Sequence, residues 1–110
     1  MARPSKALRP KRRWIGVELA SQYTERGQVE AKMADMFEAK VRLMDVLPAN
    51  KRGAEVGVAI LGVTLAVAPA VREVLAGDEV WAEHGMRSVT TSGKIRLVRE
   101  RLDLPRPPRR

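Results

Sequence analysis

The residue types from which catalytic and metal sites are built are scarce in this sequence. Its 110 residues include one histidine, His84, and no cysteine, so a Ser-His-Asp triad or a His/Cys metal site has almost nothing from which to form. The segment SGK at 92–94 lacks the upstream glycine of a phosphate-binding loop. Asp45, Glu55 and Asp78 are scattered along the chain, and we expect them to be solvated, with His84 in a strand. We therefore expect no catalytic residue, no metal site and no cofactor bound by this chain.

Basic side chains are concentrated at the two ends of the chain. The 21 Lys and Arg residues outnumber the 13 Asp and Glu residues, which gives a formal net charge of +8. Residues 1–13 carry +6 with no acid, residues 94–110 carry +5, and residues 14–93 carry −3. Runs of like charge repel one another and commonly serve as contact arms for a polyanion, most often nucleic acid. The alternative is that these charges serve only solubility.

One apolar segment, residues 56–71, raises the question of a membrane span because it contains no charged side chain. As a helix it would span roughly 24 Å, which is short of the ~30 Å hydrocarbon core of a bilayer. It also contains Gly57, Gly62 and Pro69, so we expect a buried strand followed by a buried helix. The N-terminal basic run leads into WIGVELA, with an internal glutamate, rather than into the apolar region of a signal peptide. We expect a soluble, cytoplasmic protein with no membrane partner.

Hydrophobic spacing predicts alternating strands and helices in one compact domain. Ile15, Val17 and Leu19 alternate with other residues as in a half-buried strand, and Val29 and Met33 begin an apolar helical face. Strands are predicted at 13–19, 41–47 and 54–61, with a fourth in the first half of 79–89, around Val80 and Trp81. Helices are predicted after the N-cap Thr24, at 65–76 with Gly77 as its terminator, and at 94–102, and a turn is predicted at 48–53. Because Pro69 lies inside the second helix, that helix either begins near Ala68, with Pro69 in its first turn, or is kinked.

The order β-α-β-β-α-β followed by a further helix predicts an α+β sandwich of the ferredoxin-like or RNA-recognition-motif-like kind. Its antiparallel sheet would have the order 4-1-3-2, with both main helices on one face. The other face or the edges would be free for RNA or a protein partner. We expect a basic N-terminal arm at 1–12, a single domain at 13–103, and a Pro/Arg-rich tail at 104–110 that is extended or disordered.

The aromatic residues of this chain argue against base-by-base reading of a single strand. There are four, Trp14, Tyr23, Phe37 and Trp81, and no predicted strand carries an aromatic pair for stacking bases. Contacts would come mainly from Lys and Arg to phosphate, which provides affinity and positioning but little sequence information. That pattern is typical of a protein that supports a structured RNA or belongs to a ribonucleoprotein.

Two segments resemble the ends of archaeal ribonuclease P protein component 2. The first reads LRPKRRWI at 8–15, and the second reads MRS at 86–88 followed by SGKIR at 92–96. The resemblance spans roughly residues 8–102. This chain departs from the family pattern by carrying Trp14 in place of the usual Tyr, Lys94 where Thr is common, a shorter stretch between the first and third strands, and a third strand without a basic residue.

The resemblance implies a non-catalytic protein subunit of ribonuclease P, the endoribonuclease that removes the 5′ leader from precursor tRNA. In that family the RNA is the catalyst and uses Mg²⁺, so the cofactor would act through the RNA. The implied partners are ribonuclease P RNA, protein component 3 and the other protein subunits, with precursor tRNA contacted indirectly. The open alternatives are a general accessory protein for structured RNA or DNA, and a protein–protein module without RNA binding.

Basic side chains near the two motifs are the predicted RNA-binding residues. In the expected sheet, strand four lies antiparallel to strand one, so the start of strand one and the end of strand four meet at one edge. The basic segments would therefore converge on one surface and neutralise closely spaced RNA phosphates. The predicted RNA-binding residues are Arg9, Lys11, Arg12, Arg13, Arg87, Lys94, Arg96 and Arg99.

Overall fold

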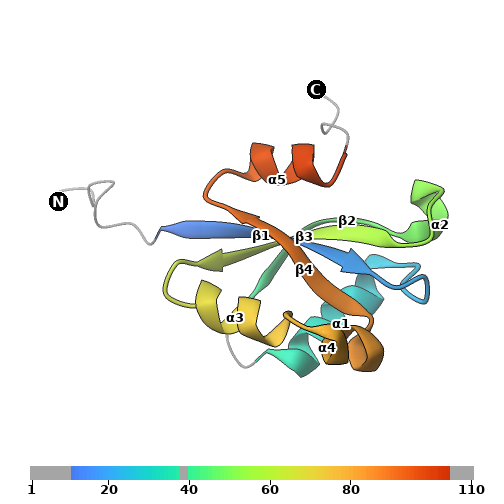
Figure 1. The fold of residues 1–110 in the computed structure, drawn as a ribbon, viewed down its shortest axis with the longest axis horizontal. Helices are drawn as coiled ribbons and strands as arrows, with labels where there is room; N and C mark the ends of the chain where they lie inside the picture. Colours follow the sequence, from blue (N-terminus) through green and yellow to red (C-terminus); the bar gives the residue numbers. More distant parts are fainter. Residues whose placement is uncertain (1–10, 38–39, 105–110) are drawn as a thin grey trace, which may run out of the picture.

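The computed structural model describes residues 11–37 and 40–104, which form an α+β fold with one sheet (Figure 1). The N-terminal arm at 1–10 and the tail at 105–110, for which predictions were made above, lie outside the described residues. In chain order the elements are β1 (Arg12–Leu19), α1 (Arg26–Met36), β2 (Arg42–Leu47), α2 (Ala49–Arg52), β3 (Gly57–Thr64), α3 (Ala68–Val74), α4 (Asp78–His84), β4 (Met86–Ser92) and α5 (Ile95–Arg101).

The four strands form an antiparallel sheet in the order β2-β3-β1-β4, as the sequence led us to expect. The central strands β1 and β3 pair along their full length, from Arg12 opposite Thr64 to Leu19 opposite Gly57. Since β1 and β2 are both antiparallel to β3, they run parallel to each other, and both begin at the same end of the sheet. Strands β3 and β4 finish at that end, which is therefore where four segments distant in sequence meet.

The main core lies between the sheet and three helices, α1, α3 and α4, which cover one face (Figure 1). From β1, Ile15, Val17 and Leu19 are fully buried there, as their alternation in the sequence predicted. Helix α1 contributes Val29 and Met33. Burial of apolar side chains of this size stabilises the fold by about 1.5–3 kcal/mol each relative to exposure, so this layer holds the three helices on the sheet.

The prediction of a fourth strand around Val80 and Trp81 is wrong. These residues and His84 lie in helix α4, and strand β4 begins only after Gly85. Gly85 ends the helix in the left-handed conformation, at φ 69°, which glycine adopts without a steric penalty. Val80 is buried in the main core, so packing on a helix outweighs the β-propensity of an isolated apolar pair.

Two neighbouring elements also differ from the prediction. The helix expected at 65–76 begins at Ala68 with Pro69 in its first turn, which is one of the two alternatives given above, but it ends at Val74, two residues earlier than expected. Gly77, expected as its terminator, has φ 93° and is instead the N-cap of α4. The turn expected at 48–53 contains the one-turn helix α2, and β3 consequently begins three residues later than predicted.

Helix α5 covers part of the second face of the sheet, which the sequence analysis expected to be free. Val98 and Leu102 are buried against Val58 and Ile60 of β3, and Leu104, assigned above to the tail, packs against the same cluster. The close approach depends on Gly16 of β1: a Cβ there would lie 2.7–3.0 Å from atoms of Thr90, Leu102 and Val98. An RNA or protein partner could therefore contact this face of the sheet only where α5 does not cover it.

None of the helices in residues 11–37 and 40–104 combines the length and the apolar character that crossing a membrane requires.

Candidate nucleic-acid interface

A row of four residues crosses the sheet close to the end where β1 and β2 begin. Arg42 of β2 lies opposite Gly62 of β3, Gly62 lies opposite Trp14 of β1, and Trp14 lies opposite Ser92 of β4. This register fulfils the expectation that the start of strand one and the end of strand four are neighbours. Basic residues at or just beyond this row form what we call the basic end. Its members are Lys11, Arg12, Arg13, Lys40, Arg42, Lys94 and Arg96.

The side chains of the basic end are open to solvent, and they form no ion pair with an acid among residues 11–37 and 40–104. All are exposed except Arg13, which is half-buried. Arg13 donates a hydrogen bond from Nη1 to the Arg12 carbonyl at 3.2 Å, and a Cβ on Gly93 would lie 3.0 Å from the same nitrogen. None of the ion pairs between described residues involves a member of the basic end.

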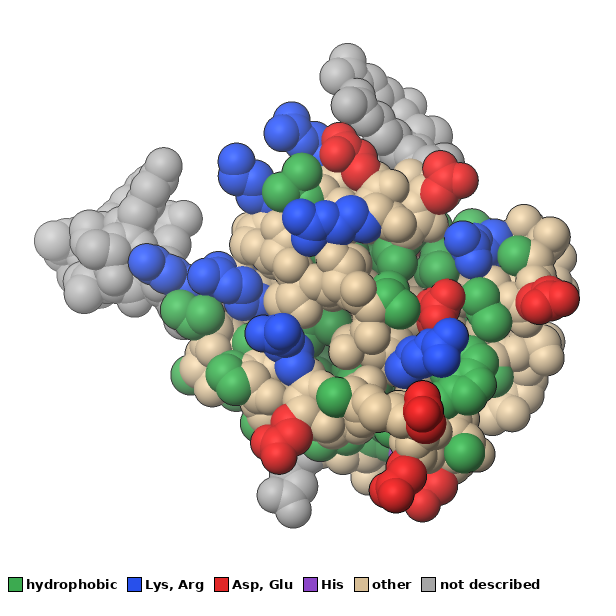
Figure 2. Space-filling model, in the orientation of Figure 1, with side chains coloured by type: hydrophobic (Ala, Val, Ile, Leu, Met, Phe, Trp, Pro, Cys, Tyr) green, Lys and Arg blue, Asp and Glu red, His purple; other side chains and the backbone are tan. Residues whose placement is uncertain are grey.

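The space-filling view shows the resulting charge distribution. On the face in Figure 2, Lys and Arg side chains gather at the left, over the beginning of β1 and over α5. Fixed cations that converge in this way raise the local concentration of a polyanion and release its counterions on binding. The arrangement can therefore hold phosphates.

Two of the predicted RNA-binding residues, Arg87 and Arg99, have acidic partners. Arg87 binds Glu18 of β1, with 2.8 Å between Nε and Oε1, and its guanidinium lies 4.6 Å from the centre of the Trp81 ring. Glu18 and Arg87 face each other near the end of β1, so Arg87 lies at the end of the sheet opposite the basic end.

Arg99 serves to attach α5 to the sheet. Its Nη1 lies 2.6 Å from Oδ2 of Asp45 on β2, and its side chain is only 17% exposed. An arginine that already forms an ion pair and is largely buried binds a phosphate less strongly than an arginine that is exposed to solvent. Of the other predicted residues, Arg9 lies outside the described residues, and Lys11, Arg12, Arg13, Lys94 and Arg96 all belong to the basic end.

Sequence reasoning missed Lys40 and Arg42, because both lie in the central segment whose net charge is negative. The predicted strand order contained the signal that would have found them, since strands one and two run parallel in that order and begin at the same end. A hollow of about 200 Å³ lies where β2 separates from the end of β3. Its lining residues are Arg12, Lys40, Arg42, Gly62, Val63, Thr64 and Val67.

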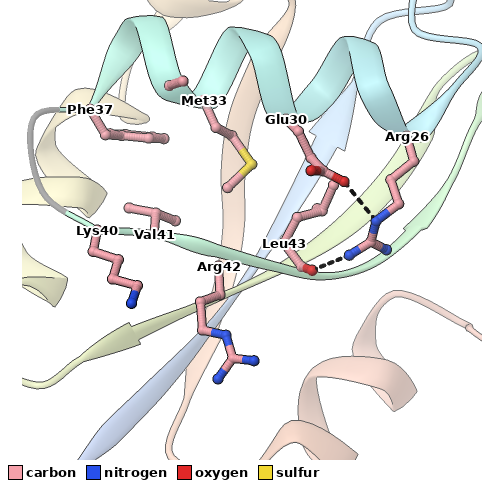
Figure 3. A pocket seen from close by; sticks show the side chains of 9 residues that line it. Arg26, Glu30, Met33, Phe37, Lys40, Val41, Arg42 and Leu43 are labelled. Carbon is pink, nitrogen blue, oxygen red and sulfur yellow. Dashed lines mark hydrogen bonds and ion pairs between the residues drawn. The ribbon is translucent and has the colours of Figure 1, made fainter.

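A second, larger groove of about 500 Å³ lies between α1 and the edge strand β2 (Figure 3). Met33 of α1 and Phe37, the residue after α1, point into it, and Lys40 and Arg42, which also line the groove, extend away from the helix. At its other end Arg26 is bound to Glu30, with 2.8 Å between Nε and Oε1, and also donates to the Leu43 carbonyl. The groove is therefore lined by both apolar and charged side chains, and one of its two arginines, Arg26, is already bound.

His84 and Tyr23 interact on the opposite side of the molecule from α5. The Tyr23 hydroxyl donates a hydrogen bond to the His84 carbonyl, and burial raises the pKa of Tyr23 above its ordinary value, partly offset by a hydrogen bond with Gln22. Within residues 11–37 and 40–104, no three His, Asp or Glu side chains come together in a way that could hold a metal ion.

Comparison of this chain with protein-family models, with curated proteins and with solved structures found no match in any of the three.

Proposed function

We propose that this chain is an RNA-binding protein that holds the phosphates of a structured RNA against the basic end. The observation that carries the proposal is the convergence of solvated cations from the starts of β1 and β2 and from the segment after β4, none of which has an ion pair within the described part of the chain. Such a cluster provides affinity and orientation without reading sequence.

We further propose that the RNA is ribonuclease P RNA and that the chain is a non-catalytic, cytoplasmic subunit of that enzyme. The support is the sequence resemblance together with the register, since the two motif segments at 12–15 and 92–96 are neighbours through the Trp14–Ser92 pair. The RNA would supply the chemistry with its Mg²⁺, and protein component 3 and other subunits would complete the particle. Fixed cations would lower the Mg²⁺ concentration needed to compress the RNA phosphates.

We also propose that the fold is a ferredoxin-like sandwich. The strand order and the placement of α1 and α3 on one face are compatible with a ferredoxin-like sandwich, extended here by α2, α4 and α5. In this reading α5 is an addition that narrows the surface available for RNA. RNA contact would consequently be concentrated at the basic end rather than spread over the sheet.

Reconstitution tests the proposal. The full chain is added to the ribonuclease P RNA of its own organism with the other protein subunits, and removal of the tRNA 5′ leader is measured at low Mg²⁺. We expect the wild type to raise the cleavage rate and the Lys11→Gln/Arg12→Gln/Lys94→Gln variant to lose most of that gain. A rate that is the same with and without the wild-type chain would overturn the subunit assignment.

Binding assays separate the alternative functions. A general accessory protein would bind unrelated RNA or DNA duplexes as tightly as ribonuclease P RNA. A protein–protein module would show no salt-dependent affinity for any of these nucleic acids. Either result would replace the ribonuclease P proposal, and only the second would contradict RNA binding itself.

A further inference from the structure

The indole of Trp14 lies over the backbone of the neighbouring strand. Trp14 faces Gly62 across the β1–β3 pair. A Cβ on Gly62 would lie 3.2 Å from Cε3 of Trp14, which is a tight contact, and 2.8 Å from its Cζ3, which is closer than such atoms approach one another. Gly62 therefore leaves the space in which the six-membered ring of the indole rests against β3, and any larger residue would displace it.

The outer part of this indole is not sealed by the fold. Trp14 packs beside the cluster under α5 but is only partly buried. Of the other aromatic side chains, Tyr23 and Phe37 are buried in the main core, and Trp81 is covered by the Arg87 guanidinium at 4.6 Å. Among the described residues Trp14 is thus the aromatic that combines exposure with a place in the row beside the basic end.

Two cations that have no ion pair among the described residues are neighbours of Trp14 and Gly62 in the sheet register. Arg12 is two residues earlier on β1 and therefore on the same face of the sheet, and Arg42 lies opposite Gly62 from the other side. Together with Lys40, these residues line the hollow of about 200 Å³ that adjoins Gly62. The hollow and the indole thus share Gly62 as a common border.

We propose that this corner of the basic end is a subsite for one unpaired nucleotide. Its phosphate occupies the hollow among Arg12, Lys40 and Arg42, and its base stacks on Trp14. Stacking tolerates any base because every base has a π-face, so the subsite selects unpaired RNA rather than a sequence. The inference rests on the proposed RNA-binding function and adds to it that the RNA presents a bulged, looped or terminal nucleotide here.

Fluorescence of the full chain tests this proposal directly. The Trp81→Phe variant leaves Trp14 as the only tryptophan, and phenylalanine keeps a ring beneath Arg87. This variant is titrated with a nine-residue oligouridylate, with an abasic oligoribonucleotide of equal length, with a blunt RNA duplex and with polyglutamate. We expect the oligouridylate to quench Trp14, and the abasic strand and the duplex to bind in a salt-dependent way with little quenching.

Affinity measurements supply the second readout. Trp14→Leu should weaken binding of the oligouridylate by a factor of about 10 and leave binding of the blunt duplex unchanged. Thermal unfolding of each variant checks that it is folded, and Trp14→Phe, which keeps an aromatic face, should restore part of the lost affinity. If Trp14→Leu fails to fold, the quenching titration of the Trp81→Phe variant still decides the question.

The possible failures are distinguishable. Duplex binding together with unchanged Trp14 fluorescence on adding oligouridylate would overturn the subsite and leave the proposed function intact. Equal quenching by the abasic strand would also overturn it, because the contact would then involve phosphate alone. Quenching by polyglutamate as strong as by oligouridylate would indicate an acidic protein partner instead. Absence of binding to every RNA probe would overturn the proposed function and this inference together.

Discussion

Replacement of Lys40 and Arg42 by glutamine tests whether the basic end acts as one phosphate-binding surface. Arg42 begins β2 and Lys40 lies two residues before it, far in sequence from the two basic termini. The fold brings both of them to the hollow that Arg12 also lines. Each phosphate neutralised by a protein cation adds roughly 0.7–0.9 to the slope of log K against log salt. The Lys40→Gln/Arg42→Gln variant should therefore lower the magnitude of this slope by about 1.4–1.8.

The expected change in affinity is large enough to measure by fluorescence anisotropy of a labelled structured RNA. Over a fourfold rise in salt, a slope difference of that size makes the wild type lose about tenfold more affinity than the variant. The two proteins should differ most at low salt and converge at high salt, because the lost contacts are ionic.

Two matched controls make the result interpretable. Lys32→Gln/Lys51→Gln removes the same charge from α1 and α2, and Arg87→Gln removes a cation that already binds Glu18. Both controls should keep the wild-type slope. An unchanged slope for Lys40→Gln/Arg42→Gln would refute the inclusion of β2 in the interface. An equal fall in the Lys32/Lys51 control would show that the slope reports net charge rather than a localised surface.

Further predictions concern stability and titration. Gly16→Ala should destabilise the fold by about 1–3 kcal/mol in urea unfolding, because its Cβ would lie 2.7 Å from Thr90. Gly27→Ala, in helix α1 with no atom within 4 Å of the added Cβ, should instead stabilise it by about 0.5–1 kcal/mol; the same sign for both variants would contradict this packing. Leu102→Ala should cost about 2–5 kcal/mol in the same measurement, and no loss would show that α5 is not docked as described. Tyr23, the only tyrosine, should titrate above pH 10 in the native state by absorbance at 295 nm. Because its folded pKa is raised, its contribution to stability is complete below pH 10 and is lost as the pH rises through the folded pKa; equal midpoints in native and unfolded protein would contradict this.

The arrangement of the sheet could be predicted from the sequence because local patterns determine it. Alternating apolar residues such as Ile15, Val17 and Leu19 identify a strand with one buried face, and the order of strands and helices leaves few connections that avoid crossing. The strand order in turn brings the start of β1 beside the end of β4, so the convergence of two basic segments could be expected before any coordinates were known.

Features that depend on packing between distant segments could not be predicted in the same way. Helix α4 contains Val80 and Trp81, whose individual preferences favour strands, and its helical state depends on burial against the main core. The docking of α5 depends on the absence of a side chain at Gly16. A pattern of hydrophobic residues does not indicate that a glycine is needed at this position.

Charge pairing was the main limit on predicting the site. In the sequence, Arg87 and Arg99 cannot be told apart from the arginines of the basic end. In the structure, however, Arg87 is paired with Glu18 and Arg99 is paired with Asp45. A basic residue contributes to a phosphate site only when no carboxylate neutralises it, and this depends on register rather than on residue type. The same register adds Arg42 to the site, although it lies in the segment 14–93, whose net charge is −3.

Amide chemical-shift mapping of the full chain with a structured RNA tests the central claim most directly. If the basic end is the RNA-binding surface, the largest perturbations will fall at residues 11–14, 40–42, 62–64 and 92–96. The opposite end of the sheet, at residues 47–57 and 84–87, will remain unchanged. Perturbations concentrated at that opposite end, or absent from the chain at saturating RNA, would contradict the account.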